Sequence, residues 1–197
     1  FDVLYRGVVQ GQVNWTHSGE HNVNNALAAL AAAHHIGVQP KDGISALCQF
    51  GGVKRRMELL GTVAGISVYD DFAHHPTAIA TTLEGLRGRV DSGRIVALIE
   101  PRSNTMRMGV YIDRLAPATA CADEVIWYQP PGLDWCLDSV IEGSPTPARL
   151  STDLDLSVRE LADSLNDGDH LVIMSNGGFA GVHQRIMAAL KARWETT

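Results

Sequence analysis

The sequence has few cysteines and no excess of positive charge. Cys48, Cys121 and Cys136 lack the spacing of metal ligands, and three thiols cannot all pair with one another. We therefore expect a reduced, cytoplasmic protein. The formal net charge is −6, whereas a general nucleic-acid surface needs a basic stripe that neutralises phosphates. Any anion that this protein binds must therefore meet a local cluster of positive side chains.

The sequence also lacks a long apolar run. The longest nearly apolar stretch, ALAALAAAHHIGV (26–38), is too short to span a bilayer and contains two histidines, so it predicts a buried helix and no membrane partner. No signal peptide opens the chain. It begins instead with the strand-like FDVLYRGVV, which we interpret as the start of a piece cut from a longer protein. A G-x-x-x-x-G-K-[ST] phosphate loop is absent from all 197 residues.

The first fifty residues differ in pattern from the rest. Residues 1–17 predict a pair of strands with glycine at the bend, and residues 18–37 predict an alanine-rich helix that ends at Gly37. A second helix is expected from about Pro40 to Phe50. It runs into the pair Gly51-Gly52, where we place a domain boundary. The prediction is therefore a partial domain over residues 1–52 and a second domain over residues 53–197.

Strands alternate with helices after this boundary, which predicts an α/β fold with a mainly parallel, Rossmann-like sheet covered by helices on both faces. The fold class rests on apolar strand-like runs separated by amphipathic stretches. The expected strands are a hairpin over 58–72 bent near Ala64-Gly65, then 94–100, 124–129 and 170–175. The expected helices are 76–88 with Pro76 at its first position, 111–120 broken at Pro117, 153–165 and 179–194, while PPGLDW and EGSPTPA are expected loops.

Polar loops follow three of the expected strands: DDFAHHPT, EPRSNTMR and SNGGFAG. Ligands of such sheets bind beyond the carboxyl ends of the strands, so these loops are expected to meet at one cleft. Polar loops are common after strands, and it is the coincidence of all three that points to function. The candidate residues are Asp70, Asp71, His74, His75, Arg102, Ser103, Asn104, Arg107, Ser175 and Asn176.

Several kinds of site compete for the segment DDFAHH. Its carboxylates and imidazoles could bind a metal, but adjacent His74 and His75 leave an extended backbone in different directions, and no H-x-x-x-H or C-x-x-C partner exists, so we expect no metal site. No G-x-S-x-G motif supports a nucleophile. SNGGFAG is not the full G-x-G-x-x-G fingerprint of dinucleotide enzymes, and a plain tight turn is an equal alternative.

A nucleotide site has more physical support. An aspartate at a strand end can accept the hydroxyls of a ribose, and the helix from Pro76 presents free N–H groups to an anion. Asn22 and Asn25 lie three residues apart near a helix start, where their carboxamides suit an adenine edge or, alternatively, ordinary capping. Lys54, Arg55 and Arg56 form either a phosphate clamp or a solvated turn.

Three segments carry a resemblance to a known family: GEHNVNNALAA, GGVKRRMELLG and YDDFAHHPTA resemble the ATP-dependent Mur ligases, which build the peptide of the bacterial cell wall. The likeness covers nearly the whole chain. EPRSNTMRMG and MSNGGFAGVHQ resemble the branch that recycles murein peptides by joining L-alanyl-γ-D-glutamyl-meso-diaminopimelate to UDP-N-acetylmuramate. The neighbouring branch, which adds L-alanine, shares the aspartate-to-HHPT loop.

The resemblance implies a three-domain enzyme that uses ATP and Mg²⁺ and forms an acyl phosphate on the muramate carboxylate. Residues 1–52 would end the central ATP-binding domain, and residues 53–197 would form the C-terminal domain. The Mg²⁺ ligands would lie upstream of Phe1. By position, His21, Asn22 and Asn25 would lie at the adenine, Arg56 at the phosphates and Asp71 at the ribose. Facing the incoming peptide would be His74, His75, Arg102, Ser103, Asn104, Arg107, Ser175 and Asn176.

The missing phosphate loop leaves one rival of a different class, a binding module that captures a nucleotide or an anionic peptide without chemistry. Under the ligase hypothesis, the isolated 197-residue chain is expected to fold but to be inactive and to bind ATP weakly at best.

Overall fold

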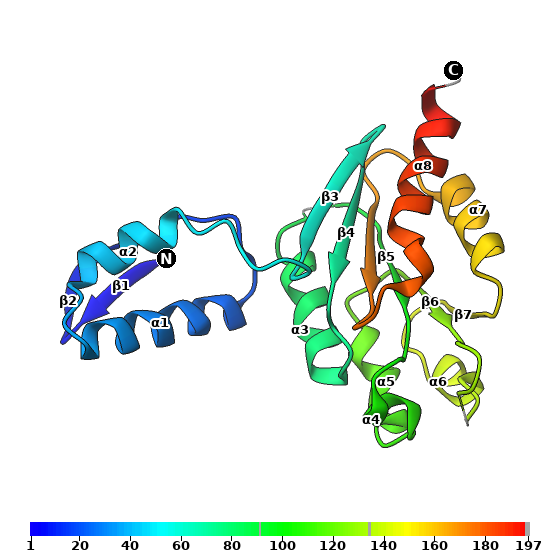
Figure 1. Cartoon of the computed structure of the whole chain (residues 1–197), viewed down its shortest axis with the longest axis horizontal. Helices are drawn as coiled ribbons and strands as arrows, with labels where there is room; N and C mark the ends of the chain where they lie inside the picture. Colours follow the sequence, from blue (N-terminus) through cyan, green and yellow to red (C-terminus); the bar gives the residue numbers. More distant parts are fainter. Residues whose placement is uncertain (91, 134, 196–197) are drawn as a thin grey trace. The chain divides into compact units, whose positions relative to one another are not determined.

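The computed structural model describes residues 1–90, 92–133 and 135–195. The chain divides into two compact units, Phe1–Val53 and Lys54–Thr197. Figure 1 shows both units coloured along the sequence. In these described ranges, no helix has the length and apolar character that a membrane crossing requires.

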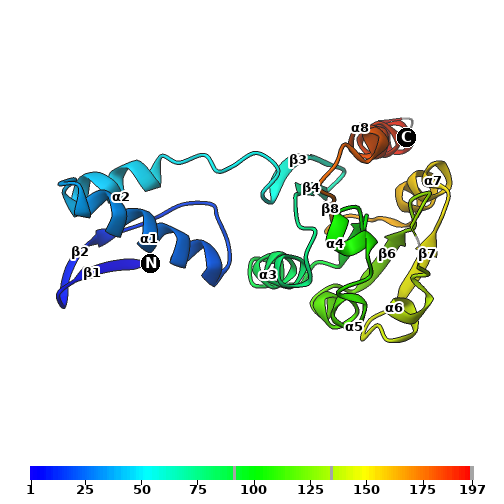
Figure 2. The ribbon, with the colours of Figure 1, turned by 60° about the horizontal axis from the view of Figure 1, so that its bottom comes forward.

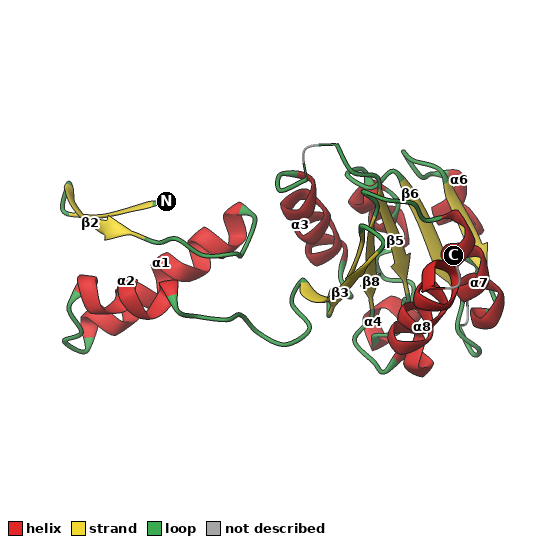
Figure 3. Cartoon of the chain, turned by 90° about the horizontal axis from the view of Figure 1, so that it is seen from above, coloured by secondary structure: helices red, strands yellow, loops and turns green. Residues whose placement is uncertain are grey.

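Unit 1 contains a β-hairpin and two helices, as the sequence predicts (Figure 3). The burial expected for residues 26–38 is wrong in this unit, since Ala26 is the buried residue of the helix Glu20–His35 and Leu27 is 41% exposed. Its small core is built on Val3, Val13 and Ile44. Gly37 follows α1 with φ 100°, a conformation that glycine adopts without strain, so the predicted end of this helix is confirmed. The elements are β1 (Asp2–Tyr5), β2 (Val8–Gln12), α1 (Glu20–His35) and α2 (Pro40–Cys48).

Unit 2 contains a sheet of six strands in the order β3-β4-β8-β5-β6-β7. β3 pairs antiparallel with β4, and the other neighbouring strands are parallel, so the predicted mainly parallel α/β fold is confirmed. The strands are β3 (Glu58–Val63), β4 (Ile66–Asp71), β5 (Ile95–Ile99), β6 (Glu124–Tyr128), β7 (Ala148–Ser151) and β8 (His170–Met174). The helices are α3 (Pro76–Arg87), α4 (Asn104–Arg107), α5 (Ile112–Leu115), η1 (Pro117–Thr119), α6 (Asp138–Glu142), α7 (Leu154–Ser164), η2 (Phe179–Gly181) and α8 (Val182–Glu195).

Two hydrophobic layers cover the sheet, one on each face. Successive residues of a strand point to opposite faces, so Ala97 of β5 packs in the layer of α3 while Val96 and Leu98 pack in the layer of α7 and α8. Figure 2 shows α3 and α5 on one side of the strands and α7 and α8 on the other. Both faces of β5 are fully buried, which explains the uninterrupted apolar run IVALI.

Three short elements are absent from the sequence-based prediction. The edge strand β7 begins at Ala148, directly after a stretch predicted as loop, and its pairing with β6 rather than its composition makes it a strand. The helices α4 and α6 have four and five residues. Their length leaves too few turns for a helical periodicity to show in the sequence.

Candidate functional site

Three neighbouring strands end at the same level of the sheet. Asp71 of β4 and Ile99 of β5 both pair with Met174 of β8, which lies between them. The loops that follow these strands therefore start side by side, at the edge where parallel α/β sheets bind ligands.

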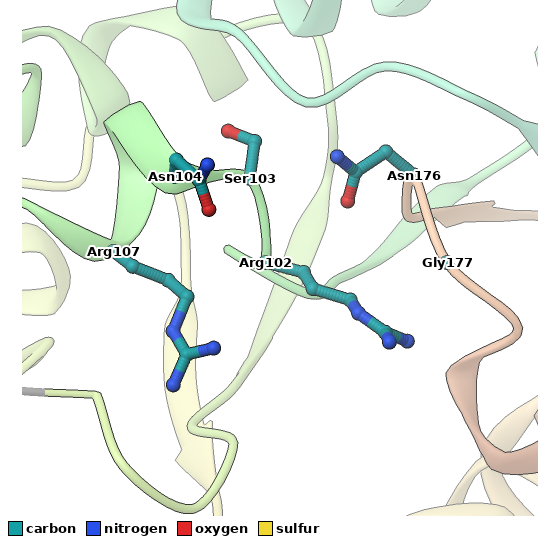
Figure 4. A pocket seen from close by; sticks show the side chains of 6 residues that line it. All are labelled: Arg102, Ser103, Asn104, Arg107, Asn176 and Gly177. Atoms are coloured by element: carbon teal, nitrogen blue, oxygen red, sulfur yellow. The ribbon is translucent and has the colours of Figure 1, made fainter.

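A pocket of about 360 Å³ opens between the loop after β5 and the loop after β8. Figure 4 shows Arg102, Ser103, Asn104 and Arg107 on one segment and Asn176 and Gly177 on the other, with the Arg102 side chain extending toward the side of Gly177. Five of the lining residues were candidates from the sequence, whereas Gly177 was not. The lining residues are Arg102, Ser103, Asn104, Arg107, Asn176 and Gly177.

The helix α4 presents part of this lining. It begins because the Ser103 hydroxyl accepts a hydrogen bond from the Met106 backbone N–H, 3.4 Å away, and the Met106 side chain is buried. It ends against Trp135, whose Nε1 lies 3.0 Å from the carbonyl oxygens of both Met106 and Arg107. The Arg107 guanidinium donates to the Gly132 carbonyl at 2.9 Å. Asn104 and Arg107 are consequently held on a short, anchored segment.

Arg102 has fewer hydrogen-bond partners than Arg107, the other arginine of the pocket. Within the described ranges its guanidinium has no hydrogen bond and no carboxylate partner. It lies against the backbone of Gly177, where an added Cβ would overlap Nη1 and Cζ of the guanidinium. A side chain at position 177 would therefore displace the Arg102 guanidinium, whose donors remain available to an anion.

Asn176 and its neighbour Ser175 have different surroundings. The amide oxygen of Asn176 is buried and has no hydrogen-bond partner among the described residues, which leaves an acceptor at the pocket wall. Ser175 does not line the pocket. Its side chain is fully buried, donates to a Glu100 carboxylate oxygen and accepts from the Gly177 N–H at 2.9 Å. Ser175 thus shapes the loop instead of facing a ligand.

The two histidines of the DDFAHH segment also lie outside the pocket lining. Nδ1 of His75 accepts from the Thr77 N–H at 3.3 Å and so caps α3, while its ring packs edge-on against Tyr111 with centroids 4.4 Å apart. Nδ1 of His74 donates to the Phe72 carbonyl at 2.9 Å. In this arrangement both rings stabilise the entry to α3. The His74 carbonyl accepts from the hydroxyl of the pocket residue Ser103 at 3.4 Å, and the peptide contact expected for the two histidines stays a prediction.

Asp71 differs from the expected ribose ligand. Its carboxylate is only 2% exposed; one oxygen accepts from the Met57 N–H and the other from the Ala73 N–H, both at 2.7 Å. Burial raises the pKa of Asp71 above its ordinary value, and the two backbone hydrogen bonds and the Arg56 charge oppose that rise. The geometry therefore gives Asp71 a structural task, which is to hold the segment that enters unit 2.

The other ATP candidates keep more open surroundings. Arg56 is exposed, and its guanidinium lies 5.6 Å from the centre of the Phe72 ring. In unit 1, Asn22 and Asn25 both lie on α1. Nδ2 of Asn22 donates to the Ser18 carbonyl at 2.7 Å, which is local capping, whereas Asn25 is exposed and His21 is half-buried. The nucleotide contacts expected for these residues stay predictions.

A prediction follows from His183, which lies beneath these loops. Burial lowers its pKa below the ordinary 6.5, the Arg55 charge adds to that effect, and the Asp70 carboxylate opposes it. As pH falls, this histidine takes up its proton at a higher pH in the unfolded chain than in the folded chain. The free energy of unfolding should therefore fall as pH drops through about 6.5. Urea unfolding between about pH 7.5 and pH 5.5 should show this loss, and His183→Gln should flatten the slope. An equal slope in both proteins would contradict the assignment.

Comparisons with known proteins agree on one family. A family model described as "Mur ligase, glutamate ligase domain" matches residues 55–177. The UDP-N-acetylmuramate:L-alanyl-γ-D-glutamyl-meso-2,6-diaminoheptandioate ligase of Escherichia coli (strain K12) is 47% identical over 196 residues, which cover 99% of this chain and 43% of that protein. The UDP-N-acetylmuramate:L-alanine ligase of Mycobacterium sp. (strain JLS) is 34% identical over 91% of this chain and 39% of that protein.

A solved structure gives the same result. The crystal structure of a murein peptide ligase from Psychrobacter arcticus 273-4 matches with a TM-score of 0.72 and 49% identity, over 90% of this chain and 38% of that one. The chain therefore spans less than half the length of the relatives it matches. The resemblance predicted from the three sequence segments is confirmed: this chain belongs to the Mur ligase family.

Proposed function

We propose that this chain forms part of an ATP-dependent ligase that joins L-alanyl-γ-D-glutamyl-meso-diaminopimelate to the carboxylate of UDP-N-acetylmuramate in peptidoglycan recycling. The observation that carries the proposal is the pocket between Arg102 and Asn176, in a chain whose sequence is nearer to the tripeptide ligase than to the L-alanine ligase. We place the reaction in the cytoplasm.

The pocket suits a peptide with several carboxylates. Two guanidinium groups, those of Arg102 and Arg107, can each meet a carboxylate with paired N–H donors, and the unpartnered Asn176 oxygen can accept a peptide N–H. A single alanine would leave most of the 360 Å³ empty. Substrate size and charge therefore both favour the tripeptide over L-alanine.

The same proposal gives the chain its place in the enzyme. Residues 1–52 would be the end of the central ATP-binding domain, and residues 53–197 the C-terminal domain. His21, Asn22 and Asn25 would contact the adenine and Arg56 the phosphates, whereas Asp71 would act by holding the segment next to Arg56. Mg²⁺ would accompany ATP; among the described residues, no group of three or more His, Cys, Asp or Glu side chains is arranged to hold it.

The contribution of these residues is orientation and charge stabilisation. In the proposed reaction a C–N bond forms between the peptide amine and the muramate carboxyl carbon, and ADP and phosphate are released. The pocket arginines would fix the far end of the peptide so that its amine meets the activated carboxyl group. No side chain of this chain is required as a covalent nucleophile.

The test uses the full-length protein that contains this chain, with ATP, Mg²⁺ and UDP-N-acetylmuramate. ADP release is expected with the tripeptide and not with L-alanine alone. The isolated 197-residue chain serves as a control and should release none. Release with L-alanine only would assign the neighbouring biosynthetic step, and release with neither amine would favour a binding module without chemistry.

A further inference from the structure

Arg55 is the hub of a network beneath the pocket. Its Nε lies 3.1 Å from Oδ2 of Asp70 at the end of β4. Its Nη2 donates to the carbonyl oxygens of Ser175 at 2.6 Å and Gly177 at 2.8 Å, in the loop after β8. One side chain near the start of unit 2 therefore joins the end of β4 to the loop after β8.

The charge of Arg55 is needed where it lies. Asp70 is 8% exposed, and an unpaired carboxylate so buried is costly. Nε2 of His183 lies 3.1 Å from Oδ1 of Asp70, but burial lowers the pKa of His183 and so disfavours its charged form. Arg55 thus supplies the compensating positive charge.

The loop that Arg55 grips forms one wall of the pocket. This 175–177 loop is also bound to the loop after β5, because the Ser175 hydroxyl donates a hydrogen bond to Glu100. Gly177 in turn lies directly against the Arg102 guanidinium, with no room for a Cβ between them. A displacement of the Gly177 carbonyl therefore moves the surface on which Arg102 rests.

The backbone around Arg55 is held in an unfavourable conformation. Arg55 and Met57 have φ values of 59° and 48°, in the left-handed region that non-glycine residues seldom adopt. The surrounding contacts maintain it: Arg55 N–H donates to Glu58 at 2.8 Å, and its carbonyl accepts from the Phe72 N–H at 2.8 Å. Strain that persists because neighbours enforce it is a mark of functional sites.

We propose that Arg55 is a positioning residue for the peptide pocket, one that fixes the 175–177 loop and, through Gly177, the orientation of Arg102. Its role as a positioner of the peptide rests on the proposed function; its hold on the loop does not. Arg55 itself lies outside the pocket lining. A lysine in its place could pair with Asp70 but lacks the rigid fork that reaches both carbonyls as well.

The kinetic test compares Arg55→Ala, Arg55→Lys and a matched control in the full-length protein. The control is Arg94→Ala. Arg94 also joins a buried aspartate, Asp169, to a backbone carbonyl, that of Ser164, but precedes β5 at the opposite edge of the sheet. Arg55→Ala should raise KM for the tripeptide about tenfold with kcat within about twofold, since a small misplacement weakens binding. Arg94→Ala should leave KM unchanged at a similar loss of Tm.

Arg55→Lys separates positioning from charge pairing: it should recover most of the lost Tm while KM stays raised. Equal KM values for wild type, Arg55→Ala and Arg94→Ala, or equal increases in both alanine variants, would overturn the proposal.

A second readout does not depend on substrate. Amide hydrogen exchange of Gly177, whose N–H donates to Ser175, should be faster in Arg55→Ala than in wild type and unchanged in Arg94→Ala. If wild type does not turn over the tripeptide, the proposed function fails. Hydrogen exchange of Gly177 still tests whether Arg55 holds the loop. Unchanged exchange in Arg55→Ala would overturn that grip.

Discussion

Arg102→Ala is expected to raise KM for the tripeptide on the order of 30-fold in the proposed full-length ligase, because charge-assisted hydrogen bonds to a carboxylate contribute about 2 kcal/mol. The guanidinium has no partner among the described residues, so its loss leaves no protein group unpaired. Folding stability should therefore stay within about 0.5 kcal/mol of wild type, as for other exposed positions. Steady-state kinetics with varied tripeptide and thermal unfolding measure the two quantities.

Two matched variants sharpen this experiment. Arg102→Lys keeps the charge but loses the paired donors, so its KM should lie between those of wild type and Arg102→Ala. Arg159→Ala removes an exposed arginine on α7, away from the pocket residues, and should leave KM unchanged. KM for ATP should not change in any of the three. A normal tripeptide KM in Arg102→Ala would remove this arginine from the peptide site.

The fold was predictable where hydrophobic patterns were long. The five-residue run of β5 is buried on both faces, and Ile79, Leu83 and Leu86 of α3 form one buried stripe. Such patterns indicate burial directly, because the spacing of apolar residues shows which face of a helix or strand is buried. The edge strand β7 has a single buried residue, Ser151, and therefore shows no apolar pattern in the sequence. Its existence depends on β6 beside it.

For the candidate site, the sequence predicts which loops lie close together but not where their side chains point. Parallel strands end at a common edge, so the order of strands and loops along the chain is enough to place the loop after β5 near Asn176. Side-chain directions could not be predicted this way. Ser175 turns inward to Glu100, and His75 caps α3, because of partners that local sequence does not specify. The grip of Arg55 joins residues 120 and 122 positions apart.

For Asp71, the position in the sequence motif and the observed geometry predict different roles. The sequence places it at a ribose, whereas the structure places its oxygens on the N–H groups of Met57 and Ala73. Asp71→Asn should lower the free energy of unfolding by about 3 kcal/mol, because one charge-assisted acceptor is lost and an amide donor is turned toward a buried N–H. The loss should be present without any nucleotide.

Urea unfolding of the 197-residue chain measures this effect through tryptophan fluorescence, since Trp127, Trp135 and Trp194 all lie in unit 2. Asp163→Asn is the matched control, an exposed carboxylate on α7 whose replacement should change stability by less than about 0.5 kcal/mol. Normal stability of Asp71→Asn, combined with weakened ATP binding in the full-length enzyme, would restore the ribose contact. Lost stability without nucleotide would instead confirm that Asp71 holds the segment that enters unit 2, through the N–H groups of Met57 and Ala73.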